Sequence, residues 1–405
     1  MSDISFILVI TPEYPPHNIG GGGIVVQKIA KELVKRGYKV VVLAGYYQTK
    51  TPLDKPWVDK DGKIMIIWLP LLPTPRNAPY LETYMPPNIY ALLELCKILK
   101  EYKPDIVHLH GYGHLLVDCA ALTLRLRNRP YVLTIHGIPE SPLRRGISII
   151  KVLYFVYTKT LGLLTLRGAK KVTAVSKSFA FESLNYGANP RKLVVIYNGI
   201  DENYAQGTPY GAFRKNYKIS DSTKIILSIG RLTERKGFQY VIQALPYIIE
   251  EFNDVIYVII GDGPFRQMLV QLTKKLNLNK KVLFTGFIPE FLKKQALNDA
   301  DIVVIPSLRD PMPITALEAL SFGKPIVASA VDGLKELLTH EVTALLVPPA
   351  NPRAIAKAIL RLLNDSELMR KLRRNSSRLI RKYRWDKITN MYIALYKMTL
   401  SNNHA

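Results

Sequence analysis

The sequence predicts an α/β protein of two tandem Rossmann-like domains, each a doubly wound parallel sheet, that face each other across a cleft. Three observations predict it. The 405 residues exceed what one ordinary core holds. Continuously apolar runs alternate with helical patterns along the chain, as in parallel sheets covered by helices on both faces. A polar, turn-rich stretch at 201–222 separates two series of these runs.

The first series predicts the strands of an N-terminal domain, which we bound at 1–203. Its members cover 6–11, 39–44, 64–70, 105–110, 131–137, 171–176 and 193–199. The second series predicts the sheet of a C-terminal domain at 204–380, with strands at 224–230, 255–261, 281–286, 301–307, 324–330 and 344–349. A basic helical pattern follows, so we assign a C-terminal helix to 381–405. Ligands of such sheets bind beyond the carboxyl ends of the strands, which directs the search for site residues to those loops.

The net charge of +24 favours anionic partners, namely nucleic acid, an anionic membrane surface or phosphorylated small molecules. The sequence has no zinc-finger spacing and no ribonucleoprotein-type aromatic signature, so we expect no nucleic acid. The start of the chain lacks the pattern of a secretory signal. The two cysteines, Cys96 and Cys119, lie in apolar helical patterns without metal-ligand spacing. We therefore expect a cytoplasmic protein.

The segment 147–166 is the most apolar helical pattern, and Lys151 and Lys159 within it argue against a membrane span. With Arg144 and Arg145 beside it, the composition suits an interfacial helix on an anionic surface, such as the inner face of a membrane. A core-packing helix with solvated lysines fits equally well.

The loop after the first strand contains the run Gly20–Gly23 and leads into a clear amphipathic helix. Such a loop lets backbone amides approach a phosphate at the helix start. It matches neither the P-loop nor the dinucleotide fingerprint, and a flexible loop is the alternative.

Histidines mark the ends of two neighbouring strands. His108 and His110 share one face of their strand because side chains alternate, and His114 follows. No carboxylate or cysteine accompanies them, so we expect no metal. His110 is a plausible acceptor-binding residue. His136 ends the next strand, where a side chain points toward a ligand or bonds to a loop.

In the second domain, Arg231 and Lys236 share the loop after a strand, and two such cations can converge on a diphosphate. A solvated charge run is the alternative. Two further glycine-containing turns, GDGPFR at 261–266 and TGFIP at 285–289, follow later strands, and the second could contact a nucleobase edge.

The segment DIVVIPSLRDPMPITALEAL contains Asp310 and Glu318, with a helix starting near Pro313. The helix start offers amides to phosphate, Asp310 could reach sugar hydroxyls, and Glu318 could bind a ribose diol. A turn residue and a buried structural acid are the alternative readings.

In this order, the motifs resemble those of family-4 glycosyltransferases of the GT-B fold over nearly the whole chain. The resemblance implies retaining, metal-independent transfer of a sugar from a UDP- or GDP-linked donor, with no cofactor. It implies that the cations stabilise the leaving diphosphate, that Glu318 binds ribose, and that the helix around Trp385 crosses back onto the first domain. The implied catalytic residues are His136, Arg231, Lys236 and Asp310. The implied donor-binding residues are Gly20, Gly21, Gly22, Gly230, Arg231, Lys236, Gly261, Gly263, Phe287, Ile288, Asp310, Met312, Pro313, Ile314, Thr315 and Glu318.

This chain departs from the family pattern at one turn. Asp310 stands where the family usually has Glu, and Pro311 and Pro313 stand where it usually has glycine. A proline removes a backbone donor, while the amides of Ile314 and Thr315 remain. The departures leave a non-catalytic nucleotide-sugar-binding relative as an alternative.

The acceptor is the open question. The charge and the 141–171 segment favour a lipid-linked or membrane-surface glycan. A soluble acceptor is the alternative, as for a glucan, sucrose-type or sugar-phosphate transferase, and Arg144 and Arg145 near the cleft mouth could then hold an acceptor phosphate.

Overall fold

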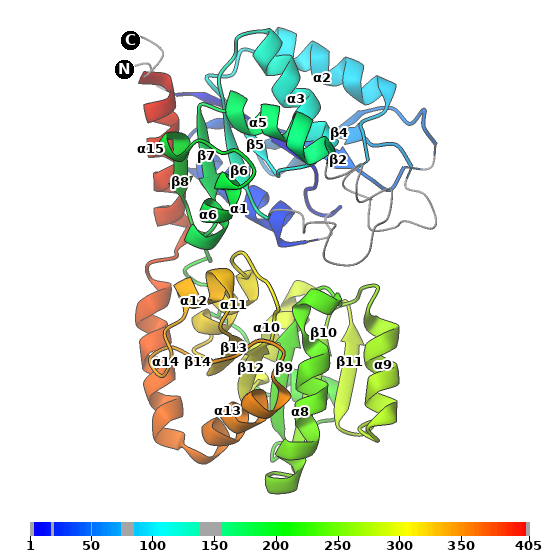
Figure 1. Cartoon of the computed structure of the whole chain (residues 1–405), viewed down its shortest axis with the longest axis vertical. Helices are drawn as coiled ribbons and strands as arrows, with labels where there is room; N and C mark the ends of the chain where they lie inside the picture. The colour runs from blue at the N-terminus through cyan, green and yellow to red at the C-terminus, as the bar shows by residue number, and fades with distance from the viewer. Residues whose placement is uncertain (1–3, 18–19, 50, 74–84, 138–155, 402–405) are drawn as a thin grey trace. The chain divides into compact units, whose positions relative to one another are not determined.

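A computed structural model describes residues 4–17, 20–49, 51–73, 85–137 and 156–401. The chain divides into two compact units, the first formed by Met1–Asn198 with Trp385–Ala405, and the second by Gly199–Arg384 (Figure 1). The predicted boundary at 203/204 thus lies inside the second unit. Arg144 and Arg145 lie outside the described residues.

The first unit is built on an eight-stranded sheet in the order β3-β4-β2-β1-β5-β6-β7-β8. Its strands are β1 (Phe6–Thr11), β2 (Lys39–Tyr46), β3 (Trp57–Asp61), β4 (Ile64–Pro70), β5 (Ile106–His110), β6 (Tyr131–Ile135), β7 (Lys171–Ala174) and β8 (Leu193–Val195). All neighbours pair in parallel except β3, which pairs antiparallel with β4 at the edge. Sequence analysis did not predict β3, because its five residues lack an apolar run.

The helices of the first unit pack on this sheet and bury its apolar side chains. Among the described residues they are α1 (Gly21–Lys35), α2 (Ile89–Glu101), α3 (Leu115–Leu126), α5 (Leu163–Gly168), α6 (Lys177–Leu184) and α15 (Trp385–Ser401). The last of these, α15, packs beside α1 although it follows the second unit in the chain.

The described part of the 147–166 segment ends in a π-helical turn at Thr158–Gly162 that continues into α5. Thr165 and Leu166 are buried, while Leu161 and Leu164 are partly exposed. Within the described part of the chain, no helix combines the length and apolarity needed to cross a bilayer.

The second unit is built on a six-stranded, all-parallel sheet in the order β11-β10-β9-β12-β13-β14. Its strands are β9 (Lys224–Ile229), β10 (Val255–Ile260), β11 (Val282–Gly286), β12 (Ile302–Ile305), β13 (Ile326–Ser329) and β14 (Leu345–Val347). These strands confirm the second predicted series. Two parallel-sheet domains confirm the predicted fold class.

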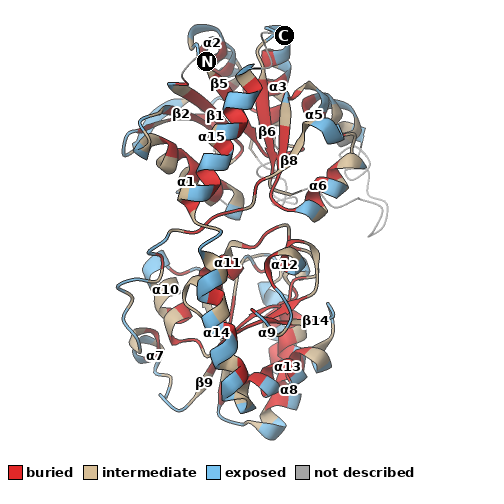
Figure 2. Cartoon of the chain, turned by 90° about the vertical axis from the view of Figure 1, so that its left-hand side faces the viewer, coloured by how far each residue is buried: buried red, intermediate tan, exposed pale blue. Residues whose placement is uncertain are grey.

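Helices cover both faces of the second sheet. They are α7 (Ala212–Tyr217), α8 (Phe238–Glu251), α9 (Arg266–Lys275), α10 (Glu290–Asp299), α11 (Ile314–Ser321), α12 (Asp332–Leu337), α13 (Pro352–Asn364) and α14 (Ser366–Ile380). In each unit the buried residues follow the strands and the inner helix faces, while the outer helix faces are exposed (Figure 2).

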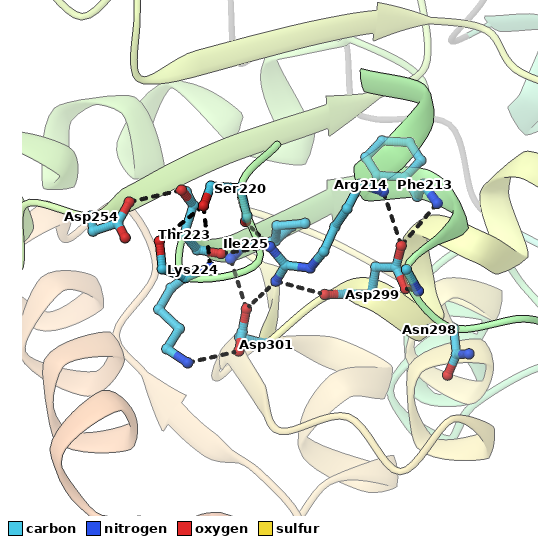
Figure 3. Close-up of polar contacts among 12 residues, drawn as sticks. Phe213, Arg214, Ser220, Thr223, Lys224, Ile225, Asp254, Asn298, Asp299 and Asp301 are labelled. Carbon is cyan, nitrogen blue, oxygen red and sulfur yellow. Dashed lines mark hydrogen bonds and ion pairs between the residues drawn. The ribbon is translucent and has the colours of Figure 1, made fainter. Parts of the chain in front are cut away.

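A buried polar network at the amino ends of β9 and β12 ties α7 to the second unit (Figure 3). The Asp299 carboxylate accepts hydrogen bonds from the backbone amides of Gly211, Phe213 and Arg214 at 2.6–3.0 Å. These amides begin α7, whose own N-cap is a glycine without a capping side chain. Arg214 is 3% exposed, and its guanidinium pairs with Asp301 at 3.1 Å.

Candidate functional site

The loop after β9 presents the two predicted cations. Arg231 is exposed, and Lys236 ends a 3₁₀ turn at Glu234–Lys236. Gly237 follows with φ +73°, and a Cβ there would lie 1.9 Å from the Pro306 carbonyl oxygen. A glycine is therefore required where this loop packs on the end of β12.

The GDGP turn after β10 packs against the loop that carries Arg231 and Lys236, here called the cation loop. A Cβ at Gly261 would lie 2.1 Å from the Gly230 carbonyl oxygen, and one at Gly263 would lie 2.5 Å from that of Leu232. Leu232 is buried, and its backbone amide donates to the Asp262 backbone carbonyl at 2.9 Å. Close backbone packing therefore explains these glycines, whether or not they also contact a donor.

Lys236 and Asp310 are brought together by the fold. Lys236 Nζ donates to Asp310 Oδ2 at 2.6 Å, and Ser307 Oγ donates to the same oxygen at 3.1 Å. Asp310 is 3% exposed. The backbone amide of Leu308 donates to the Arg235 carbonyl at 2.7 Å, which joins the two loops. The arrangement holds the lysine ammonium at the carboxyl ends of β9 and β12.

Asp332 and Gly333, at the start of α12, fix the backbone of Asp310. The Asp310 amide donates to Asp332 Oδ2 at 3.0 Å, and the Gly333 amide donates to the Asp310 carbonyl at 3.1 Å. Asp332 adopts φ +33°, an unfavourable conformation for a residue with a side chain, and burial raises the pKa of its carboxyl. Sequence analysis missed Asp332.

Helix α11 begins at Ile314 with Pro313 as its N-cap, as predicted. Met312 is buried, while Ile314 and Thr315 are partly buried in the first turn. No acidic residue occupies this turn, so its amides and dipole suit an anion. In the TGFIP turn, Ile288 is buried and Phe287 is 86% exposed, which leaves the Phe287 ring open to a stacking partner.

Glu318 is buried on α11 and belongs to an ionic cluster with Lys293 and Glu290. Lys293 Nζ donates to Glu318 Oε1 at 2.7 Å and pairs with Glu290 at 2.8 Å. The Tyr204 hydroxyl lies 3.0 Å from Glu318 Oε1 and 2.6 Å from Glu290 Oε1. Burial alone would lower the pKa of Lys293, but the charges of Glu318 and Glu290 outweigh it and raise that pKa. Lys293 and Tyr204 were not predicted, because neither has a motif.

The first unit carries the remaining predicted residues. Helix α1 begins at Gly21, with Gly20 as an N-cap that has no side chain to offer. Glu13 Oε2 accepts a hydrogen bond from the Gly20 amide at 3.3 Å. A Cβ at Gly22 would lie 3.3 Å from Glu13 Oε1 and 3.8 Å from the His136 ring, so this loop and His136 are neighbours. Glu13 is a further residue that sequence analysis missed.

His110 and His136 contact each other directly. His110 Nδ1 lies 2.9 Å from His136 Nε2, and the rings stack with centroids 5.2 Å apart. His110 is 1% exposed, so the predicted acceptor residue lies behind His136 rather than on a surface. His108 and His110 share one strand face as predicted, with ring centroids 3.9 Å apart.

Neither unit shows a clustered metal-ligand set within its described residues, where no group of three or more His, Cys, Asp or Glu side chains is arranged to hold an ion. Both nitrogens of His108 are engaged, at 2.7 Å, with the Tyr396 hydroxyl and Thr134 Oγ1.

Comparisons with known proteins identify the family of the chain. The family model "Glycosyltransferase Family 4" matches residues 19–204, and "Glycosyl transferases group 1" matches residues 211–379. An uncharacterized glycosyltransferase of Methanocaldococcus jannaschii is 32% identical over 97% of this chain and 98% of its own length. The N-acetyl-alpha-D-glucosaminyl L-malate synthase of Bacillus anthracis is 25% identical over 95% of this chain and 94% of its own.

Solved structures show the same fold. Sucrose-phosphate synthase of Thermosynechococcus elongatus superposes with a TM-score of 0.80 at 22% identity, covering 98% of this chain and 100% of its own. Anabaena HepE, solved with UDP and glucose, reaches 0.76 at 20% identity, covering 98% and 100%. The chain is thus a two-domain glycosyltransferase of the GT-B type. Within that class it belongs to glycosyltransferase family 4.

Proposed function

We propose that this glycosyltransferase moves a sugar, with retention of configuration and without a metal ion, from a UDP- or GDP-linked donor to an acceptor used in glycan or glycolipid biosynthesis. One observation carries the proposal: Lys236, held by buried Asp310, shares a short loop with exposed Arg231. Two cations at the carboxyl ends of parallel strands suit a diphosphate.

The loop can stabilise a leaving group. One N–H of the Lys236 ammonium bonds to Asp310, and an ammonium has three, so two remain for diphosphate oxygens. Arg231 adds a planar fork of donors that matches phosphate geometry. Positive charge fixed where negative charge develops lowers the barrier to breaking the sugar–phosphate bond. That charge does the work a metal ion does in other transferases, which is why we propose metal independence.

Two acids would orient the donor. Both contacts to Asp310 use Oδ2, and among the described residues Oδ1 accepts no hydrogen bond. Oδ1 would accept a sugar hydroxyl. Glu318 likewise uses Oε1 for Lys293 and Tyr204, so Oε2 would accept from the ribose.

The acceptor proposal rests on charge and on one relative. The Escherichia coli UDP-Gal:alpha-D-GlcNAc-diphosphoundecaprenol alpha-1,3-galactosyltransferase is 29% identical over 76% of this chain and 79% of its own length. Its name specifies a UDP-sugar and a lipid-linked acceptor. Together with the net charge of +24, it favours a lipid-linked or membrane-surface acceptor for this chain.

The test begins with thermal unfolding in the presence of UDP-, GDP- and ADP-sugars, since a ligand that binds the folded state raises the unfolding temperature. One donor should stabilise the wild type, and Lys236→Ala should abolish that shift. Arg235→Ala is the matched control, because it removes an exposed positive charge from the same turn and should keep the shift.

Activity with the selected donor should persist in EDTA, and NMR should show the anomeric configuration of the donor retained in the product. Sedimentation with anionic vesicles at low salt tests the membrane. Inversion would exclude the retaining mechanism, loss of activity in EDTA would exclude metal independence, and absent vesicle binding would favour a soluble acceptor. Donor binding without transfer or hydrolysis would identify a non-catalytic relative.

A further inference from the structure

Three imidazole rings lie in contact inside the first unit, at the carboxyl ends of β5 and β6. The His108 and His110 ring centroids are 3.9 Å apart, and those of His110 and His136 are 5.2 Å apart with ring planes 14° from parallel. His108 and His110 are buried, and His136 is partly buried. Only His136 of the three therefore has a route to a ligand.

All three rings are neutral near pH 7. Burial lowers the pKa of His108 to about 3 and that of His136 to about 4. Burial, with the neighbouring rings, also holds the pKa of His110 well below its ordinary value. A neutral imidazole carries one N–H and one unprotonated nitrogen, so the hydrogen bonds of one ring decide what the next can offer.

The bond between His110 Nδ1 and His136 Nε2 allows two arrangements. In the first, His110 Nδ1–H donates and His136 Nε2 accepts. In the second, the direction is reversed, and the neutral His110 ring must then carry its proton on Nε2. Both arrangements fit the 2.9 Å separation.

The far nitrogen of His110 decides between them. His110 Nε2 is fully buried and has no hydrogen-bond partner among the described residues. The first arrangement leaves a bare lone pair there, while the reversed one leaves an unpaired N–H donor. Orphaned buried donors are rarer in proteins than under-satisfied acceptors. The first arrangement is therefore preferred.

We propose that His110 is a positioning residue that fixes His136 in the tautomer protonated on Nδ1, so that His136 offers a hydrogen-bond donor to an oxygen of the bound sugar or its acceptor. Nδ1 of His136 forms no hydrogen bond with the described residues. The ring also lies beside the Gly20–Gly23 loop, 3.8 Å from the Cβ position of Gly22. The ligand part of this inference rests on the proposed function, whereas the tautomer does not.

The tautomer is measured directly by two-dimensional ¹⁵N–¹H NMR of the full-length, ¹⁵N-histidine-labelled protein without ligand. His136→Gln identifies the signals of His136 by their loss. We expect a pyrrole-type Nδ1 and a pyridine-type Nε2 for His136. A His136 ring protonated on Nε2 in the wild type would overturn the proposal, without any variant of His110 needing to fold.

Two variants of His110 test its positioning role. His110→Phe keeps the bulk of the ring but removes the donor, so the His136 signals should shift toward a mixture of both tautomers. His110→Asn places an amide donor near the position of Nδ1 and should restore the Nδ1-protonated form. With the donor sugar, kcat should fall about tenfold or more in His110→Phe, with little change in KM, and recover in His110→Asn.

The positioning role of His110 and the proposed function can be contradicted independently of each other. An unchanged His136 tautomer in His110→Phe would overturn the positioning role even if the enzyme is active. Complete absence of transfer by the wild type would remove the proposed function while the NMR result on the tautomer still stands.

Discussion

Lys236 Nζ and Asp310 Oδ2 lie 2.6 Å apart although 74 residues separate them in the chain. Their side chains are 21% and 5% exposed, so the carboxylate is the more deeply buried partner. The backbone amide of Leu308 donates to the Arg235 carbonyl at 2.7 Å, which holds the Asp310 turn against the loop of Lys236. At this short distance between the loops, the Asp side chain is long enough to reach the lysine. The departure from the usual Glu is therefore accommodated by contact between the two loops.

Replacing Lys236 with Met, alone and together with Asp310→Asn, should separate the contribution of Lys236 to stability from its contribution to binding. The variant keeps the aliphatic stem but leaves the Asp310 carboxylate buried without its cation, which should cost roughly 3 kcal/mol in urea unfolding. Affinity for the donor's nucleoside diphosphate, measured by calorimetry, should fall at least about tenfold. Adding Asp310→Asn should recover part of the stability and none of the affinity. Restored affinity in the double variant would show that Lys236 does not bind the diphosphate.

Gly237→Ala should disrupt the cation loop. Its φ of +73° is strained for any side chain, and the new Cβ would lie 1.9 Å from the Pro306 carbonyl oxygen. Gly207→Ala is the matched control, since φ is +69° and nothing lies within 4 Å. The control should lose only about 1–2 kcal/mol for the left-handed backbone, whereas Gly237→Ala should lose more and also weaken nucleotide binding. Equal losses would contradict the packing argument.

Asp299→Ala should destabilise the second unit. Asp299 lies at the end of the sheet opposite the cation loop. The substitution removes the carboxylate that accepts hydrogen bonds from three backbone amides at the start of α7, at a cost of about 3–5 kcal/mol in urea unfolding. The ion pair of Arg214 with Asp301 stays in place. Asp254→Ala removes an exposed carboxylate of the same network and should unfold near wild type (Figure 3). At low temperature, where Asp299→Ala is folded, its affinity for the donor should equal that of wild type. A lower affinity would mean that this network is part of the binding site.

The buried histidines should make the protein acid-sensitive. Burial lowers the pKa of His108 from 6.5 to about 3. Below pH 6.5 His108 is therefore protonated in the unfolded chain but stays neutral in the native state. The contribution of neutral, buried His108 to stability is therefore fully present above pH 6.5 and is lost as the pH falls from 6.5 toward 3. His110 and His136 contribute with the same sign.

Urea unfolding of His108→Gln measures this contribution. Between pH 5.5 and 4.5 the unfolded wild type binds about one more proton on His108 than the native state does. The free energy of unfolding of His108→Gln should therefore depend less steeply on pH than that of wild type, by roughly 1.4 kcal/mol per pH unit. His340→Gln, which changes an exposed histidine, should leave the slope unaltered. An identical slope in His108→Gln would mean that His108 is already protonated in the native state.

Local sequence predicted most of the fold because buried parallel strands are continuous apolar runs. Edge strand β3 was not predicted, because Val58 and its neighbours are largely exposed and form no apolar pattern. The loops of Arg231 and Asp310 were found because both follow apolar strands and lead into helices.

Contacts that depend on tertiary structure were not predictable. Nothing local indicates that Tyr396 bonds to His108 across 288 positions, or that Tyr204 and Lys293 hold Glu318. The burial of His110 was likewise hidden, since a strand-end histidine can face a ligand or another side chain with the same sequence pattern. Distant partners, rather than motifs, decide these roles.

The return of α15 to the first unit has a consequence for biosynthesis. Residues Gly199–Arg384 are contiguous, so the second unit has all of its chain once Arg384 has left the ribosome. The first unit begins earlier, yet it lacks the Tyr396 hydroxyl that bonds to His108 until α15 has been translated. The unit whose synthesis begins first is therefore the one completed last, and until α15 is made His108 lacks its hydrogen bond to Tyr396.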